Sequence, residues 1–452
     1  MSCNHHQVFE IPKPFIYKEL RMKREEDFEM PGKVIKDPVH GFIELNKIQE
    51  ELLEQPELQR LAWIKQLGLT FLVYPGAHQT RLEHSLGTSH LAGKVAEKLS
   101  LDEKEKKTLE VAGMLHDLGH APFSHTVEEV MPRDHMEITK GLIKGEEKTS
   151  NRNKIPEIIE KHGLNPEKIA KLVNGEYKEE KHLQDIISSQ LDIDQLDYLA
   201  RDSYYTGVSY GSIETDRIID MMQVTEEDDG KTITFLEKGI TPLEDYLVAR
   251  DHMYSNVYCH KTAAIAEKML LRSFQSAVNK IKENKAWLEA RGEKGEKELK
   301  RTFEMTDGEL LQALRESNPY SREIIKRITR RKLYKQCYSI KTSDTEEKKK
   351  KLDMIIEKEE KKIEKEIAEK GSIDPEEVIV NKQRESSLNA EPRLREFDIM
   401  IKLKNSETAR LEEVSKITKA LKSKQPVSHI FSVYTTPENR GELGKTVEKY
   451  LK

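Results

Sequence analysis

Four side chains that bind metal ions stand near the ends of apolar helical segments in this sequence. His84 falls in the first turn of one expected helix, the pair His116–Asp117 lies near the end of a second, and Asp194 begins a third. Burying ionisable side chains is costly unless a partner neutralises them, and a metal ion is the most effective such partner. Two imidazoles and two carboxylates suit iron, manganese, zinc or cobalt, with positions left open for water and a substrate oxygen.

The segment Val111–His125 carries the densest group of potential ligands. It reads VAGMLHDLGHAPFSH and predicts a buried helix that ends at Pro122, because proline pushes Ala121 out of the helical conformation. His116 and His120 are four residues apart, so we expect them on one helical face. An adjacent His-Asp pair alone more often makes an ordinary hydrogen bond, and it is the ligand candidates elsewhere in the chain that favour a metal.

A substrate with phosphate groups is indicated by the residues around this set. Thr80 and Glu83 form a capping box, which predicts a helix that begins at Arg81. A helix N-terminus favours anions, and Arg81 stands there. Three further histidines occur in the same part of the chain: His120, His125 and His135.

The elements that must position these side chains are predicted to be mainly helical. Residues 33–45 (KVIKDPVHGFIEL) read as a hairpin, and an apolar helical pattern follows over residues 50–67. Ser100 and Glu103 form a second capping box, which we expect to begin the helix that carries His116.

A third cap-like pattern runs from Asp192 to Gln195. On the helix after it, Asp194, Tyr198 and Asp202 are spaced by four and share a face, while leucines bury the other side. An exposed acidic face is the alternative, but the tyrosines around it favour a site. Beyond it, KTITFLE (231–237) alternates as a strand, and 243–277 is a long helical region.

The composition changes to lysine and glutamate beyond about residue 282. Lys326–Lys335 is a basic cluster, either a solvated helix face or a site for phosphate or nucleic acid. Residues 346–370 predict an amphipathic helix stopped by Gly371. Three strand-like runs and a final helix then predict a small α+β unit; the runs are 378–380, 399–403 and 429–434.

The chain of 452 residues is long enough for two or three domains. We divide it into an N-terminal arm (1–32), a catalytic domain (33–285) and a Lys/Glu-rich helical and α+β region (286–452). The formal net charge of -5 argues against a general nucleic-acid binder. No membrane segment is predicted, and the 3 cysteines without paired spacing favour the cytoplasm.

Together, these motifs resemble a known family. The pattern H…HD…D over His84, His116, Asp117 and Asp194 resembles the HD-domain metal-dependent phosphohydrolases. Six motifs in order resemble the deoxynucleoside triphosphate triphosphohydrolases among them, in the branch of the animal sterile-α-motif and HD-domain protein, over about residues 33–277. They are DPVHGFIEL, RLAWIKQLG, YPGAHQTRLEHSLGT, HDLGHAPFSH, DIDQLDYLARDSYYTGV and VYCHK. We expect no sterile-α-motif domain in this sequence. The resemblance implies a mainly α fold, an HD-domain helical core with small β-hairpins and a C-terminal α+β region.

The resemblance also implies roles for the residues around the substrate sugar and base. Gln66 would contact the 3′-hydroxyl, and Leu67 would crowd the 2′ position. Tyr198 and Asp202 would line the sugar pocket, and Tyr258 would pack near the sugar or base.

Another set of residues would hold the phosphates. Arg81, His120 and His135 would surround the α-phosphate together with His125, our choice of general acid for the leaving 5′-oxygen. Arg250 would hold a distal phosphate. The implied reaction is attack of a metal-activated hydroxide on the α-phosphorus, which releases a deoxynucleoside and intact triphosphate. Mg²⁺ would accompany the substrate phosphates.

The sequence departs from the family at three positions. Gln195 stands where the animal enzyme has a lysine that meets the phosphates, and Glu54 and Ala62 replace its guanine-reading Asp and Arg. The first difference weakens the preference for triphosphates, and the other two put guanine-nucleotide activation in doubt.

Two alternatives stay open on the sequence. One is an HD-domain nucleotide phosphatase or phosphodiesterase that acts on mono- or diphosphates, motivated by Gln195. The other is a non-catalytic nucleotide- or RNA-binding protein that uses Lys326–Lys335. As partners we expect a nucleotide substrate, a nucleotide effector in case activation is retained, and a second copy of the chain in a homo-oligomer, either tetramer or dimer.

Overall fold

The computed structural model describes residues 32–131, 133–227, 230–283, 302–341, 355, 358–385, 399–423 and 428–451. Helices dominate these residues, and the strands form three small sheets, which confirms the predicted fold class. All but the last residue of the predicted arm (1–32) lies outside the described residues. None of the described helices is both long enough and apolar enough to cross a membrane.

The chain begins with the predicted hairpin. Strand β1 (Val34–Asp37) pairs antiparallel with β2 (Gly41–Glu44). At the turn, Asp37 Oδ1 accepts hydrogen bonds from the backbone N–H groups of Val39 and His40, both at 2.8 Å. Gly41 has φ +81°, a conformation that side chains disfavour. The turn therefore holds Asp37 and His40 close to each other.

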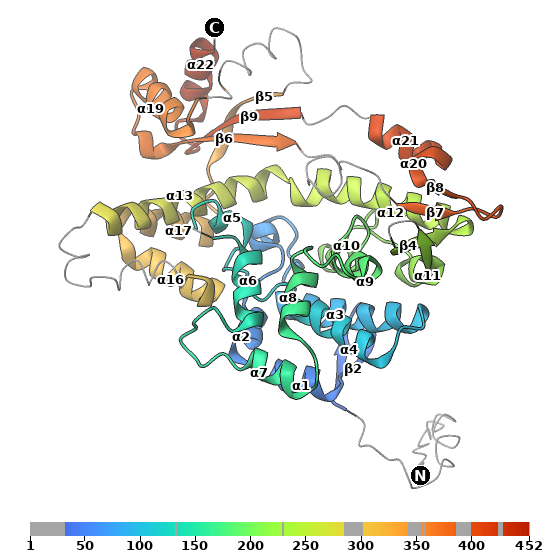
Figure 1. The fold of residues 1–452 in the computed structure, drawn as a ribbon. Helices are drawn as coiled ribbons and strands as arrows, with labels where there is room; N and C mark the ends of the chain where they lie inside the picture. The colour runs from blue at the N-terminus through green and yellow to red at the C-terminus, as the bar shows by residue number, and fades with distance from the viewer. Residues whose placement is uncertain are drawn as a thin grey trace, which may run out of the picture.

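A bundle of helices follows the hairpin (Figure 1). Its elements are α1 (Lys47–Leu53), α2 (Pro56–Gln59), η2 (Arg60–Trp63), η3 (Gly68–Leu72), α3 (Arg81–Lys98), α4 (Glu103–Leu115), α5 (His125–Glu128), α6 (His135–Lys144), α7 (Ile155–Lys161), α8 (Pro166–Val173), α9 (Lys181–Ile187), α10 (Ile193–Thr206) and α11 (Thr215–Met221). The helical stretch expected over residues 50–67 is divided, because Gln55 before Pro56 is extended, as a residue before proline prefers.

Two helix boundaries around the expected site differ from prediction. Asp102, not Ser100, caps α4, with its carboxylate accepting from the N–H groups of Lys104 and Glu105. The pattern at Ser100 was wrong because Ser100 has φ 54°, outside the extended conformation of an N-cap.

Helix α4 also ends earlier than expected, at Leu115, so His116 and His120 do not share a helical face. The physical reason is the close approach of α6. A Cβ at Gly119 would overlap the backbone oxygen of His135, and the chain turns there in short i→i+3 steps.

Helix α13 (Lys261–Glu283) runs across the molecule between the N-terminal bundle and the C-terminal strands β5, β9 and β6 (Figure 1). It follows β3 (Met222–Glu227), β4 (Gly230–Leu236), η4 (Glu237–Gly239), α12 (Ile240–Met253) and a π-helical turn, η5 (Tyr254–Tyr258). The expected strand at 231–237 is confirmed by β4, and the expected helical region 243–277 is divided by η5.

The C-terminal region contains the predicted α+β unit. Its elements are η6 (Thr302–Glu304), α16 (Asp307–Ser317), α17 (Pro319–Thr329), β5 (Lys335–Lys341), α19 (Glu360–Gly371), η7 (Pro375–Glu377), β6 (Val378–Glu385), β7 (Met400–Lys402), β8 (Thr408–Arg410), α20 (Leu411–Val414), α21 (Lys416–Ser423), β9 (Ser428–Thr435) and α22 (Arg440–Tyr450). The three predicted strand runs correspond to β6, β7 and β9. Helix α19 ends at Gly371 as predicted, although Ser372 is the residue in the left-handed conformation; most of 346–357 lies outside the described residues.

Two apolar cores support these elements. The main core extends from Ile43 of the hairpin to Ile401 of β7 and Tyr434 of β9. A smaller core lies between α19, α22 and the sheet ordered β5-β9-β6. Strand β7 pairs in parallel with β4. A sheet that contains β3 and β4, from before residue 285, therefore also contains strands from after that residue. The division at 285 stays a prediction.

Candidate metal centre and substrate cavity

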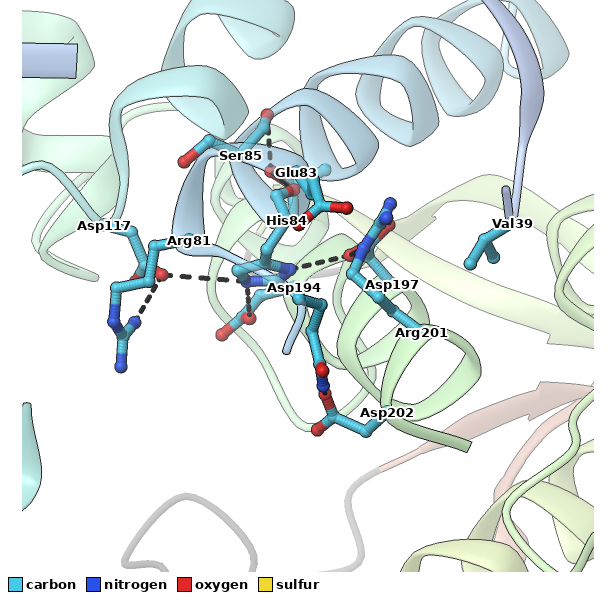
Figure 2. A network of polar contacts seen from close by, with 12 residues as sticks. Val39, Arg81, Glu83, His84, Ser85, Asp117, Asp194, Asp197, Arg201 and Asp202 are labelled. Atoms are coloured by element: carbon cyan, nitrogen blue, oxygen red, sulfur yellow. Dashed lines mark hydrogen bonds and ion pairs between the residues drawn. The ribbon is translucent and has the colours of Figure 1, made fainter. Parts of the chain in front are cut away.

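His84 is placed by the N-terminus of α3. The Thr80 N–H donates to Glu83 Oε2 at 2.6 Å, and the Thr80 hydroxyl accepts from the Glu83 N–H, so the predicted capping box is present. His84, one residue later, is buried, with Arg81 a turn before it. The helix start therefore brings an imidazole and a guanidinium to one place (Figure 2).

His116 and Asp117 follow the end of α4. His116 Nδ1 lies 2.7 Å from the Gly113 carbonyl, which can only accept, so Nδ1 carries the proton and Nε2 is free for a metal. His116 Nε2 lies 3.1 Å from His84 Nε2 and 3.3 Å from Asp117 Oδ1.

Asp194, in the first turn of α10, completes the group. Its Oδ1 lies 3.0 Å from His84 Nε2 and 3.7 Å from His116 Nε2, and Asp117 Oδ2 lies 3.9 Å from His84 Nε2. Atoms that share one ion at about 2.0–2.2 Å lie about 3–4 Å from each other. Three of the four predicted ligands, His84, His116 and Asp194, thus have donor atoms that fit one divalent metal, and Asp117 lies beside them.

The charges around this group favour a cation. Burial opposes protonation of His84, but the carboxylates of Asp194 and Asp197 outweigh it and raise the pKa of His84 to about 10. Burial likewise opposes ionisation of Asp117, yet the adjacent guanidinium of Arg81, 2.5 Å away, helps to hold the pKa of Asp117 well below its usual value. Three ionised carboxylates, Asp117, Asp194 and Asp197, therefore face His84 in the part of the chain that the structure describes.

A second histidine group lies beside the first. The rings of His120 and His135 stack with centroids 3.8 Å apart, and Glu128 Oε1 lies 2.8 Å from His135 Nδ1 and 3.5 Å from His120 Nδ1. Burial, with Arg81 and His135 nearby, lowers the pKa of His120 to about 3, so this imidazole is neutral at physiological pH. Sequence reasoning missed Glu128, whose only signal is its place on α5 after the HDLGHAPFSH motif.

These groups open onto a cavity of about 840 Å³. The predicted site residues that line it are Gln66, Leu67, Arg81, His116, Asp117, His120, His135, Asp194, Tyr198, Asp202 and Tyr258. His84 lies behind the cavity wall. His125 begins α5, but its side chain is outside the part of the structure that is described.

Asp202, which lines the same cavity, is a buried carboxyl. This carboxyl accepts from Gln79 Nε2 at 2.7 Å and from the Tyr258 hydroxyl at 2.9 Å. Burial raises the pKa of Asp202 to about 6. Gln66 Oε1 is buried and accepts no hydrogen bond from the described residues, so it has capacity for a ligand.

Arg250 is not brought to the cavity. It is fully buried, and its Nη1 donates to Gln195 Oε1 at 2.6 Å, while the Tyr246 hydroxyl contacts the same oxygen. Gln195 lines the cavity in front of it. Two lysines that sequence reasoning did not select, Lys268 on α13 and Lys382 on β6, also line the cavity.

Comparisons with known proteins place the chain in a family. A family model for the HD domain matches residues 81–202, and one for the HD associated region matches residues 213–452. An uncharacterized protein of Methanocaldococcus jannaschii is 34% identical over 412 residues, covering 91% of this chain and 81% of that protein. The deoxynucleoside triphosphate triphosphohydrolase SAMHD1 of Homo sapiens is 30% identical over 348 residues, covering 67% of this chain.

The chain spans 54% of the length of human SAMHD1 and 58% of its Bos taurus counterpart. Among solved structures, a phosphohydrolase from Bacteroides thetaiotaomicron superposes with a TM-score of 0.69 at 27% identity. The match covers 89% of this chain and 99% of that one.

Proposed function

Because this chain belongs to the HD-domain family, in which the HD associated region follows the HD domain, we propose that it is a deoxynucleoside triphosphate triphosphohydrolase. It would hydrolyse its substrate to a deoxynucleoside and inorganic triphosphate. The family supports a metal-dependent phosphohydrolase. The observation that carries the finer proposal is that His84, His116 and Asp194 could hold a metal ion beside a cavity of about 840 Å³, which Asp117, Gln66 and Asp202 also line.

The donor set fits iron, manganese, zinc or cobalt, held by His84, His116, Asp117 and Asp194. When bound, such an ion polarises a phosphoryl oxygen and lowers the pKa of water. Mg²⁺ would accompany the distal phosphates.

The protein residues would hold the α-phosphate in place. Arg81, at the N-terminus of α3, offers a guanidinium and an anion-favouring helix end. The neutral imidazole of His120 would donate a hydrogen bond to a phosphate oxygen, and His135 would do the same. His125 would give the proton that the leaving 5′-oxygen needs.

At the sugar end, discrimination would rest on hydrogen bonds and shape. The side-chain oxygen of Gln66 and the carboxyl of Asp202 suit a 3′-hydroxyl, and Leu67 stands where a 2′-hydroxyl would be crowded. A site built to bind a hydroxyl discriminates strongly between analogues. Tyr198 and Tyr258, whose rings meet edge to face at 6.2 Å, would pack beside the sugar or base.

A second candidate is hydrolysis of nucleoside mono- or diphosphates. Its support is that Gln195 is uncharged and Arg250 is held inside the protein by that same residue. For a triphosphate substrate, Lys268 and Lys382 would supply the positive charge that Gln195 and the buried Arg250 do not. We further propose a cytoplasmic homo-oligomer, tetramer or dimer, on the family resemblance.

Product analysis tests the proposal. The chain would be incubated with deoxynucleoside tri-, di- and monophosphates and with Mn²⁺, Fe²⁺ or Mg²⁺, and the products separated by ion-exchange chromatography. We expect a deoxynucleoside and triphosphate, with ¹⁸O from labelled water on the triphosphate. Label in orthophosphate with a diphosphate left behind would mean cleavage at the γ-phosphate, and the triphosphohydrolase proposal would be wrong.

A further inference from the structure

A buried polar chain lies behind the metal ligand His84. His84 Nδ1 is 2.7 Å from Asp197 Oδ2, on the opposite side of the ring from Nε2 (Figure 2). Asp197, on α10, has no exposed surface. Because an ionised carboxylate can only accept, Nδ1 donates to Asp197, and Nε2 is the atom that would bind a metal.

Asp197 is itself held from two sides. Arg201, one turn later on α10, donates from Nε at 2.8 Å and from Nη2 at 2.9 Å. His40 of the N-terminal hairpin contacts Asp197 Oδ1 through Nε2 at 2.6 Å. The orientation of the carboxylate is therefore fixed by three hydrogen bonds, two with Arg201 and one with His40, besides the one with the His84 ring.

The hairpin also holds the other end of Arg201. Arg201 Nη1 donates to Asp37 Oδ2 at 2.7 Å, and Asp37 Oδ1 accepts from the hairpin turn. Asp37 and Arg201 are 164 residues apart in sequence. A continuous series of contacts, through Asp37, Arg201 and Asp197, thus connects the hairpin to His84.

The packing leaves this series little freedom. A Cβ at Gly87, one turn beyond His84 on α3, would overlap the Asp197 carboxylate and the Arg201 guanidinium. The pair therefore lies directly against the α3 backbone, one turn from His84.

We propose that Asp197, Arg201 and His40 are positioning residues for His84, so that hairpin β1–β2 sets the affinity of the metal centre. This inference rests on the proposed metal site. Groups behind a metal-bound imidazole orient the ring and strengthen it as a ligand, and their loss typically lowers metal affinity about 10- to 100-fold. A merely structural role would instead lower stability and leave metal affinity unchanged.

The test measures Co²⁺ binding to the full chain by competition with a chelator, without nucleotide, alongside urea unfolding of the metal-free protein. We expect the dissociation constant to rise about 10- to 100-fold in Asp197→Asn and in His40→Gln. The visible absorption of bound Co²⁺, which reports ligand geometry, should shift in both variants. His40→Gln keeps the test usable if loss of the Asp197 charge prevents folding.

Ile43→Val is the matched control, because Ile43 lies in the same hairpin, is buried, and makes no contact in the polar chain. It should lower stability but leave Co²⁺ affinity and absorption unchanged. If wild type binds one Co²⁺ per chain and the two test variants bind it equally well, the positioning role is wrong and the metal site stands. If wild type binds no Co²⁺, the proposed function and this inference both fail.

Discussion

Replacing Asp202 by asparagine removes a buried charge and keeps the shape of the cavity. The Asp202 carboxyl accepts hydrogen bonds from Gln79 and Tyr258, yet burial outweighs them and raises its pKa from 3.8 to about 6. Asparagine keeps an oxygen for Gln79, and its amide can donate to the Tyr258 oxygen. The variant therefore fills the same space without a charge.

The magnitude follows from the shift in pKa. About two units correspond to about 3 kcal/mol, at roughly 1.36 kcal/mol per unit. Since the folded pKa is above the unfolded one, the stability contributed by protonated Asp202 is full below about pH 4 and is lost as pH rises through about 6. We expect metal-free Asp202→Asn to be more stable than wild type by up to about 3 kcal/mol at neutral pH and above.

Urea unfolding at about pH 4, 6 and 8, with a chelator present, measures this difference. The gap between the variant and wild type should widen by about 2 kcal/mol over that range. Asp216, an exposed carboxylate paired with Lys94, provides the control, and Asp216→Asn should change stability by less than about 0.5 kcal/mol. A gap that does not vary with pH would refute the reasoning.

Further predictions concern the metal and substrate groups. Asp117→Ala should lose bound metal and turnover together, by metal analysis and product assay; full activity would contradict the site. Gln66→Ala should lower kcat/KM for deoxynucleotides about 10- to 100-fold, the loss of a buried hydrogen bond worth about 1–3 kcal/mol, and an unchanged value would remove Gln66 from the sugar site. His125→Ala should keep its metal but lose about 10²–10⁴-fold in kcat, and a smaller loss would argue for another general acid. Gln195→Met should destabilise the protein by about 1–3 kcal/mol in urea, because Arg250 Nη1 and the Tyr246 hydroxyl lose the oxygen that they share; normal stability would mean that this contact is not needed.

The residues of the candidate metal group could be selected from the sequence because each carries a local signal. His84 follows a capping box, His116–Asp117 follows an apolar helix, and Asp194 lies just inside a helix start. Each of these signals lies within a few residues of the ligand. Only the fact that these helices meet at one place could not be predicted without the structure.

Boundaries set by distant contacts were not predictable. Two capping patterns overlap before α4, at Ser100 and Asp102, and the local sequence does not choose between them. Helix α4 ends early because α6 packs against Gly119. This contact gives no signal in the sequence of α4. Arg250 is buried behind Gln195 through a contact between residues 55 apart in the sequence. The pair Asp37–Arg201 joins residues 164 apart.

The parallel pairing of β4 with β7 has a consequence for how the protein is made. Phe235 pairs with Ile401, and Ile401 is fully buried in the main core. A ribosome that adds about 5–20 residues per second needs roughly 10–30 s to deliver β7 after β4. During synthesis the edge of β4 and its apolar neighbours stay uncovered for that time, so a chain cut short before β7 would present an aggregation-prone surface to the cell's chaperones.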